Sequence, residues 1–310
     1  MNDATTTSQH TPCLSREVVR KIFAKAVAEC ANEARLCTQP GLSAWELYHA
    51  PATEAIKQEI LRAGRKLWER QYVDGNGGNI SCRIAPGYVL STPTLCSKGD
   101  LRAGDISLVD MENNQIFGDR PHTSEIKLHL EIYKAEPRAK AVLHCHPPYA
   151  TAYAVAGVAP RGDLIPEQEV FVGPVAYAPY ETPGSDAVAR SVLPLVHDHN
   201  TILLGNHGIV CWADTVTHVE WYAEVVDTYC KTLQIAEGIG KPLKEIPPEK
   251  IQELLAIKQK LGLPDPRLPR PAAQPVETPV PMNSLPEEPE LAALVENFAA
   301  QAIELFGKHR

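Results

Sequence analysis

Residues 139–148 have the sequence AKAVLHCHPP, an apolar run that closes with two histidines and two prolines. Successive side chains of a β-strand point to opposite faces, so His144 and His146 are predicted to share one face and to bind one metal ion together. Pro147 and Pro148 end the strand and place the histidine pair at the rim of a sheet, where functional sites usually form.

A third histidine lies in a comparable setting. Residues 201–210, TILLGNHGIV, have the pattern of a buried strand interrupted by a tight glycine-flanked turn that carries His207. Three imidazoles with an open fourth position are typical of a catalytic zinc site. Any one of these histidines taken alone is more simply a residue of the core or the rim. The H-x-H pair together with His207 favours the metal site.

Composition excludes several classes of function. The chain has 310 residues and a formal net charge of −8, which argues against nucleic acid or an anionic membrane as its main partner. No apolar run approaches the ~20 residues of a membrane span, and residues 1–12 lack the apolar core of a signal peptide. The eight cysteines show no C-x-x-C spacing and no disulfide framework. We therefore expect reduced thiols and a cytoplasmic protein.

The chain is predicted to have several parts, and the change of composition after Leu263 marks one clear boundary. Residues 263–289 contain nine prolines, which cannot build a helix or a sheet and predict an extended linker. Apolar residues at helical spacing predict helices near 15–37, 53–71 and 248–261. The predicted parts are an N-terminal extension (1–50), disordered over residues 1–14 and then helical, a catalytic domain (51–245), a short helix (246–262), the linker (263–289) and an amphipathic helix (290–310).

Two polar loops of the middle region offer hydrogen-bond donors to an anion. Residues 74–81, DGNGGNIS, combine three glycines with Asn76, Asn79 and Ser81. Residues 92–101, TPTLCSKGDL, gather hydroxyl groups and Lys98 in a turn, which suits a phosphate or a polyol. Each loop alone is equally consistent with an ordinary polar turn.

Residues 121–125, PHTSE, open a helix predicted over residues 126–135. Thr123 is a good N-cap, and a helix N-terminus favours an anion. Glu125 is therefore either an acid that complements the helix dipole or a general acid/base next to the metal. His129 lies one turn further along the same face and is predicted to pack behind the site rather than to bind the metal.

In combination these residues resemble the class II aldolase family, which includes L-fuculose-phosphate aldolase, L-ribulose-5-phosphate 4-epimerase and the non-enzymatic head of adducin. The resemblance runs from about residue 51 to residue 240. It implies an α/β fold of three layers, α/β/α, around a central, mostly antiparallel sheet, and a homotetramer with active sites between subunits. It rests on the ordered motifs GNIS (78–81), TPT (92–94), TSE (123–125), HCHP (144–147), APY (178–180) with TPG (182–184), and NHG (206–208).

Carried over position by position, the resemblance implies a site for a small phosphorylated sugar. Glu125 would be the catalytic acid. One divalent ion per subunit, zinc or another metal, would bind to His144, His146 and His207. The substrate phosphate would bind to Asn79, Thr94, Thr123 and Ser124.

Two departures from the family pattern bear on this site. Many relatives have a glycine where this chain has Leu95, so the phosphate loop is expected to follow a different backbone path. The family aldolase takes a tyrosine from the neighbouring subunit as proton carrier, whereas residues 165–171, IPEQEVF, contain none. Glu167 or Glu169 would substitute, or the acceptor site differs. No lysine stands in a clearly buried apolar setting that would indicate Schiff-base chemistry.

We therefore predict a zinc-dependent aldolase of carbohydrate metabolism. It would cleave L-fuculose 1-phosphate or L-rhamnulose 1-phosphate to dihydroxyacetone phosphate and L-lactaldehyde, with zinc as Lewis acid and Glu125 as proton donor at C3. The alternatives within the fold are a sugar-phosphate 4-epimerase and a sugar-acid-phosphate decarboxylase. Related epimerases tend to have aspartate at the Glu125 position, so glutamate favours a lyase. A metal-free, adducin-like scaffold should have lost the histidines, and all three are present.

The C-terminal segment predicts a second role. The amphipathic helix predicted over residues 290–310 is short, and an isolated helix of this length is marginal in water and needs a partner surface. It either folds back onto its own domain or a neighbouring subunit, or docks on a shell protein, as the encapsulation peptides of bacterial microcompartment cargo enzymes do. The proline-rich tether favours docking, and a shell would retain volatile lactaldehyde. The apolar stripe consists of Leu291, Leu294, Val295, Phe298, Ala302 and Leu305.

Overall fold

A computed structural model describes residues 43–270 of the chain. Its helices are α2 (Ala44–His49), α3 (Pro51–Glu69), α4 (Ile126–Ala135), α5 (Pro148–Ala156), α6 (Asp186–Val192), α7 (Val216–Gly238) and α8 (Pro248–Lys260). Its strands are β1 (Asn79–Ala85), β2 (Tyr88–Ser91), β3 (Ser107–Asp110), β4 (Gln115–Phe117), β5 (Ala141–Cys145), β6 (Ala176–Ala178), β7 (Thr201–Leu204) and β8 (Gly208–Ala213). Short helical turns are η1 (Lys98–Asp100), η2 (Ala103–Asp105) and η3 (Gln168–Val172).

The strands form one eight-stranded sheet in the order β4-β3-β2-β1-β5-β8-β7-β6. Every neighbouring pair is antiparallel except β6 and β7, which are parallel. The prediction of a mostly antiparallel central sheet is therefore confirmed. β5, which carries His144, lies between β1 and β8 and is buried along its whole length.

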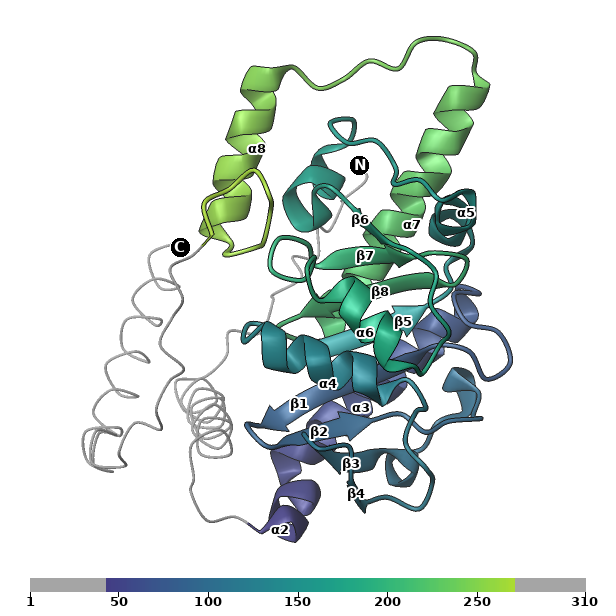
Figure 1. The fold of residues 1–310 in the computed structure, drawn as a ribbon, viewed down its shortest axis with the longest axis vertical. Helices are drawn as coiled ribbons and strands as arrows, with labels where there is room; N and C mark the ends of the chain where they lie inside the picture. The colour runs from purple at the N-terminus through teal and green to yellow at the C-terminus, as the bar shows by residue number, and fades with distance from the viewer. Residues whose placement is uncertain (1–42, 271–310) are drawn as a thin grey trace, which may run out of the picture. The chain divides into compact units, whose positions relative to one another are not determined.

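Helices cover both faces of this sheet, as predicted (Figure 1). α4 and α6 pack together on one face, while α3 and α7 lie on the other face against β1, β5 and β8. On β5, Val142 belongs to the apolar core beneath α4 and α6. His144 stands two residues further along the strand and therefore faces the same helical layer. Because β5 is a central strand, the side chains on both of its faces are buried beneath helices.

The ends of the described region differ from the sequence-based expectation. α2 lies within the predicted N-terminal extension, and Ser43 begins it with a capping box: Glu46 N–H donates to Ser43 Oγ at 3.3 Å, and Ser43 N–H donates to Glu46 Oε2 at 2.8 Å. α3 begins at Pro51, where a proline is tolerated because the first helical N–H has no acceptor within the helix.

Residues 263–270 were predicted to begin an extended linker, and they do lack helix and strand. They nevertheless pack against the domain. Lys258 Nζ lies 3.2 Å from Asp265 Oδ2, and Arg267 Nη2 lies 2.7 Å from Glu169 Oε2. The prolines prevent regular structure but do not prevent these ion pairs from holding the segment. The predicted helix near 15–37, the rest of the linker and the helix at 290–310 lie outside the described residues.

Candidate metal centre

The three predicted histidines come together at the C-terminal end of the central strand β5. One ligand nitrogen from each lies within 4.8 Å of the corresponding nitrogens of the other two. His144 and His146 are closest, with their Nε2 atoms 3.0 Å apart. The strand register explains the meeting: His144 pairs with Val210 of β8, and His207 occupies the turn that directly precedes β8.

His144 is oriented by a hydrogen bond on the side of its ring away from the cluster. Its Nδ1 lies 2.8 Å from the Ile209 carbonyl oxygen. Because a carbonyl only accepts, Nδ1 must carry the proton, which leaves the lone pair of Nε2 facing the other histidines. Burial lowers the pKa of His144 well below its usual value, and burial also lowers the pKa of His207. Both rings are therefore held in the neutral form that metals bind.

This donor set fits a divalent ion. In a tetrahedral zinc site with Zn–N bonds of about 2.0–2.1 Å, ligand nitrogens lie about 3.3 Å apart, close to the observed His144–His146 spacing. Two glycines make the approach possible. A Cβ on Gly208 would stand 2.8 Å from His146 Cδ2, and a Cβ on Gly77 would stand 3.2 Å from His146 Cε1. The His146 ring therefore occupies a narrow slot between two backbone segments.

Glu125 faces this cluster rather than its own helix. Its Oε2 lies 3.5 Å from His144 Nε2, and its Oε1 lies 3.8 Å from His207 Nε2. Asn79 Nδ2 donates to Glu125 Oε2 at 2.6 Å. α4 covers the predicted residues 126–135, but Glu125 occupies its N-cap place without any capping hydrogen bond from its side chain. The predicted N-cap role of Thr123 was wrong by two residues, because a turn over residues 123–126 precedes the helix.

The residues predicted to bind phosphate lie on adjacent segments. Thr94 N–H donates to the Pro121 carbonyl at 3.0 Å, and Thr123 N–H donates to the Thr92 carbonyl at 2.9 Å. This pairing places the loop after β2 beside the turn that contains Thr123 and Ser124. Ser124 is exposed, Thr94 is half-buried, and Thr123 and Asn79 are buried.

Two of the proposed anion donors are already engaged. The amide of Asn79 donates to Glu125, as described above. The Ser81 hydroxyl lies 2.7 Å from His129 Nδ1 and 2.8 Å from the Tyr133 hydroxyl, which excludes it from an anion site. His129 is fully buried, and burial lowers its pKa to about 3. It therefore packs behind the cluster as a neutral group, as the sequence predicted.

Leu95 adopts the backbone conformation that a glycine would favour. Its φ is +49°, and its side chain is 77% exposed. A different backbone path was expected for this loop because a leucine, unlike a glycine, meets a steric penalty in the left-handed region. In the structure the chain accepts this strained conformation at Leu95 and projects the side chain away from the core.

Lys98 is a functional candidate, although its sequence context indicated only a hydrogen-bond donor in a polar turn. The sequence predicts no lysine in a clearly buried apolar setting; Lys98 is nevertheless buried, with only 1% of its surface exposed, although its ammonium contacts carbonyl oxygens. Its Nζ donates to the carbonyls of Cys96 at 2.8 Å and Asn76 at 3.2 Å, and it makes no ion pair within residues 43–270. Burial lowers its pKa to about 8, against the opposing effect of Cys96 and Glu125. Lys57 and Lys258 are also buried.

The two glutamates considered as replacements for the missing tyrosine have different surroundings. Glu169 is 1% exposed; its Oε1 accepts from Asp163 N–H at 2.7 Å and its Oε2 from Arg267 Nη2 at 2.7 Å. These bonds occupy both oxygens and exclude Glu169 as a proton carrier in this arrangement. Glu167 lies two residues earlier in the sequence and is exposed.

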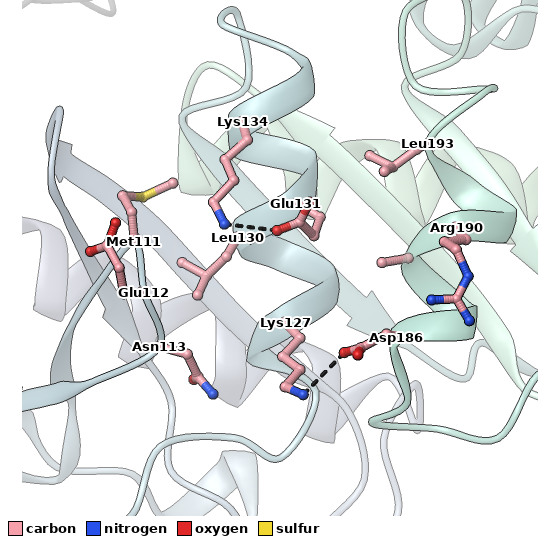
Figure 2. A pocket seen from close by; sticks show the side chains of 11 residues that line it. Met111, Glu112, Asn113, Lys127, Leu130, Glu131, Lys134, Asp186, Arg190 and Leu193 are labelled. Atoms are coloured by element: carbon pink, nitrogen blue, oxygen red, sulfur yellow. Dashed lines mark hydrogen bonds and ion pairs between the residues drawn. The ribbon is translucent and has the colours of Figure 1, made fainter.

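A cavity of about 390 Å³ lies away from the histidines, between residues 111–113, α4 and α6. Figure 2 shows two pairs of charged side chains that point toward each other: Lys127 Nζ lies 3.0 Å from Asp186 Oδ1, and Lys134 Nζ lies 2.8 Å from Glu131 Oε1. None of the three histidines lines it. Because its charges are largely paired, this cavity offers less to a charged ligand than the histidine cluster does.

A family model of the class II aldolase and adducin N-terminal domain matches residues 58–234, more than half of the chain. The chain belongs to this family. The matched range contains the three histidines and every other predicted site residue. Among residues 43–270, no helix is both long and apolar enough to cross a membrane.

Named relatives of this class II aldolase family member have different activities. The chain is 36% identical over 160 residues to a 3-oxo-tetronate 4-phosphate decarboxylase of Haemophilus influenzae, covering 50% of this chain and 76% of the relative. It is also 36% identical over 170 residues to an L-fuculose phosphate aldolase of Methanococcus maripaludis, covering 54% of this chain and 91% of the relative. These relatives are enzymes, and they do not share one substrate.

Solved structures give the same result for the fold. YgbL from Escherichia coli superposes with a TM-score of 0.61 at 27% identity, covering 65% of this chain and 98% of YgbL. An L-fuculose 1-phosphate aldolase superposes with a TM-score of 0.61 at 26% identity, covering 67% of this chain and 97% of that chain. The predicted fold class and family are thereby confirmed.

Replacing His146 with alanine should weaken zinc binding by orders of magnitude, because one of three protein ligands is lost. Metal content after gel filtration and competition with a chromophoric chelator measure this. His218→Ala is the matched control, since His218 is a partly exposed histidine on α7 paired with Asp214. Stoichiometric zinc in the His146→Ala variant would show that the ligand set is wrong.

Proposed function

We propose that this protein is a zinc-dependent lyase that cleaves the bond between the carbons α and β to the ketone of a small phosphorylated substrate. The main candidate reaction is cleavage of L-fuculose 1-phosphate or L-rhamnulose 1-phosphate to dihydroxyacetone phosphate and L-lactaldehyde. The observation that carries the proposal is the Glu125 carboxylate, which stands 3.5 and 3.8 Å from nitrogens of two candidate metal ligands. An acid/base group beside a metal is the arrangement that such proton transfer needs.

The proposed chemistry divides between the metal and the residues of the chain. A divalent ion held by His144, His146 and His207 would supply Lewis-acid stabilisation of negative charge on the substrate oxygens. Glu125 would give its proton to C3 of the departing three-carbon fragment in cleavage and take it back in condensation. Asn79 donates to Glu125 Oε2 and would hold this carboxyl in position.

The buried charge of Lys98 is an argument for an anionic substrate. A buried ammonium without a carboxylate partner is unfavourable unless another charge compensates it. Within residues 43–270, Lys98 donates hydrogen bonds only to carbonyl groups, and these bonds join the 74–78 loop to the loop after β2. A substrate phosphate near these loops would supply the compensating charge. Because Lys98 is bonded to carbonyls and the proposed metal acts as Lewis acid, no Schiff base is required.

Decarboxylation of a 3-oxo-tetronate 4-phosphate is the second candidate, because it forms the same fragment. Loss of C1 as carbon dioxide leaves the enediolate of dihydroxyacetone phosphate, which is also what aldol cleavage between C3 and C4 leaves. The two reactions differ at the departing group. Aldol cleavage must remove the proton of the C4 hydroxyl, whereas carbon dioxide leaves without a proton transfer.

The surroundings of residues 165–171 favour this second candidate. The segment has no tyrosine, and both Glu169 oxygens are engaged by Asp163 and Arg267. Glu167 is the remaining carboxylate of that segment, and an aldolase would need it, or a group from a neighbouring subunit, as the base at O4. A decarboxylase needs neither.

A panel of substrates separates the candidates. Zinc-loaded protein should release dihydroxyacetone phosphate from L-fuculose 1-phosphate or L-rhamnulose 1-phosphate, together with lactaldehyde, as measured with a coupled NADH assay. Release of dihydroxyacetone phosphate and carbon dioxide only from 3-oxo-tetronate 4-phosphate would identify the decarboxylase instead. Conversion of L-ribulose 5-phosphate to its epimer without cleavage would contradict lyase function altogether.

On the substrate so identified, Glu125→Gln should lower kcat by ~10²–10⁴-fold while KM changes far less, because glutamine keeps the shape but transfers no proton. Steady-state kinetics at saturating zinc measure both constants. Glu131→Gln serves as the control on the same helix, since Glu131 pairs only with Lys134 in the described structure. Near-normal turnover of Glu125→Gln would reduce Glu125 to a residue of the helix start.

We also propose a homotetramer with its active sites between subunits, and encapsulation of this cytoplasmic enzyme in a bacterial microcompartment. The tetramer follows from the family resemblance. The encapsulation rests on the sequence of residues 263–310, where a proline-rich tether precedes one apolar helical stripe. A shell would confine the aldehyde that the main candidate reaction releases.

Deleting residues 285–310 should leave lyase activity and the mass of the oligomer unchanged while abolishing association with shell proteins. Co-purification with coexpressed shell proteins and light scattering measure the two properties. A matched variant with Leu294 and Phe298 replaced by serine should behave like the deletion, because it disrupts only the apolar stripe. Loss of the folded oligomer in either variant would instead assign the helix to the subunit structure.

A further inference from the structure

His146 stands just beyond the secondary structure that holds the other ligands. β5 ends at Cys145, so His146 is outside the regular strand ladder. Its backbone N–H donates to the Tyr72 carbonyl at 2.7 Å. Its ring lies between Gly77 and Gly208 with almost no spare room. The direction of this imidazole therefore depends on where the backbone at residue 146 is fixed.

The helix that follows cannot fix that backbone by itself. α5 has Pro147 at its N-cap and Pro148 as its first residue, and neither side chain can accept a hydrogen bond. The next two residues, Tyr149 and Ala150, bring the N–H groups at the second and third helical positions. These are the groups that an N-capping side chain normally satisfies.

Asp227 supplies the missing cap from α7, far away in the sequence. Its Oδ1 accepts from Tyr149 N–H at 2.8 Å and from Ala150 N–H at 3.0 Å. The Tyr72 hydroxyl bonds to the same carboxylate. Asp227 is buried. One carboxylate thus connects the start of α5, just after His146, with Tyr72, whose carbonyl accepts the His146 N–H.

We propose that Asp227 is a positioning residue for the metal centre, which sets the direction of the His146 imidazole by capping α5 and binding Tyr72. The proposal rests on the proposed function only in taking His146 as a metal ligand. Without the carboxylate, one buried and one partly buried N–H group lose their acceptor, and the 146–150 segment is free to shift. His144 would be less affected, because β1 and β8 hold it on both sides.

Zinc affinity of the full-length protein tests this directly. Asp227→Ala should weaken zinc binding about 10–100-fold, the range found when groups that orient metal ligands are removed. Asp227→Asn keeps one acceptor oxygen for the two N–H groups and should recover most of the affinity. Tyr72→Phe removes a single hydroxyl and should give a smaller loss. Lost activity of Asp227→Ala should return at excess zinc, which a general loss of stability would not allow.

Glu136→Ala is the matched control. Glu136 is also a buried carboxylate, but it binds Arg138 and His197 at the other end of α4. Its removal should lower the thermal midpoint with zinc affinity unchanged. Wild-type zinc affinity in Asp227→Ala would overturn the proposal, and if that variant fails to fold, the same result in Tyr72→Phe would do so. Absence of zinc binding by the wild-type protein would refute the metal site itself.

Discussion

The antiparallel pairing of β5 with β1 and β8 is the constraint on which the rest of the site depends. It places Asn79 of β1 directly opposite His144, and it places the turn that carries His207 next to the end of β5. A register shift of one residue would turn His144 to the opposite face of the sheet and replace it with an apolar neighbour. The buried core on both faces opposes such a shift, because every strand residue of β5 is packed. The stability of the fold and the geometry of the metal centre are thus determined by the same hydrogen-bonded register.

The charges around the histidines are only partly satisfied by other groups within residues 43–270. Glu125 occupies the N-cap position of α4, but its carboxylate makes no capping hydrogen bond and faces His144 and His207. Lys98 is buried, and within the described part of the chain it donates hydrogen bonds only to carbonyls, so burial lowers its pKa to about 8 despite the opposing charge of Glu125. Both groups are energetically unfavourable choices for a purely structural role. A phosphorylated substrate and a metal ion would satisfy them together.

The segments next to the site show how tertiary contacts replace local signals. Two prolines end β5 but leave α5 without a cap, and a carboxylate from α7 takes that place. Leu95 adopts a backbone conformation suited to glycine, and Arg267 donates a hydrogen bond to the Glu169 carboxylate. In each case a residue outside the motif decides what the motif can do. In the proposed reactions, the choice between an aldehyde and carbon dioxide as the departing group would therefore depend on contacts around residues 165–171 rather than on the histidine motifs.

The sequence by itself determined the family, the layered α/β fold, the meeting of three histidines and the extent of α4. These follow from short-range patterns, such as strand alternation, proline as a strand terminator and a glycine-flanked turn, whose physical meaning depends on few neighbours. Only the tertiary structure decided that Glu125 faces the metal ligands, that Lys98 is buried, that Ser81 is engaged by His129 and that Glu169 is not available. Those properties depend on which distant side chains approach each group, and no local pattern specifies such contacts. Asp227 illustrates this limit, because its hydrogen bonds reach residues more than seventy positions away in the chain.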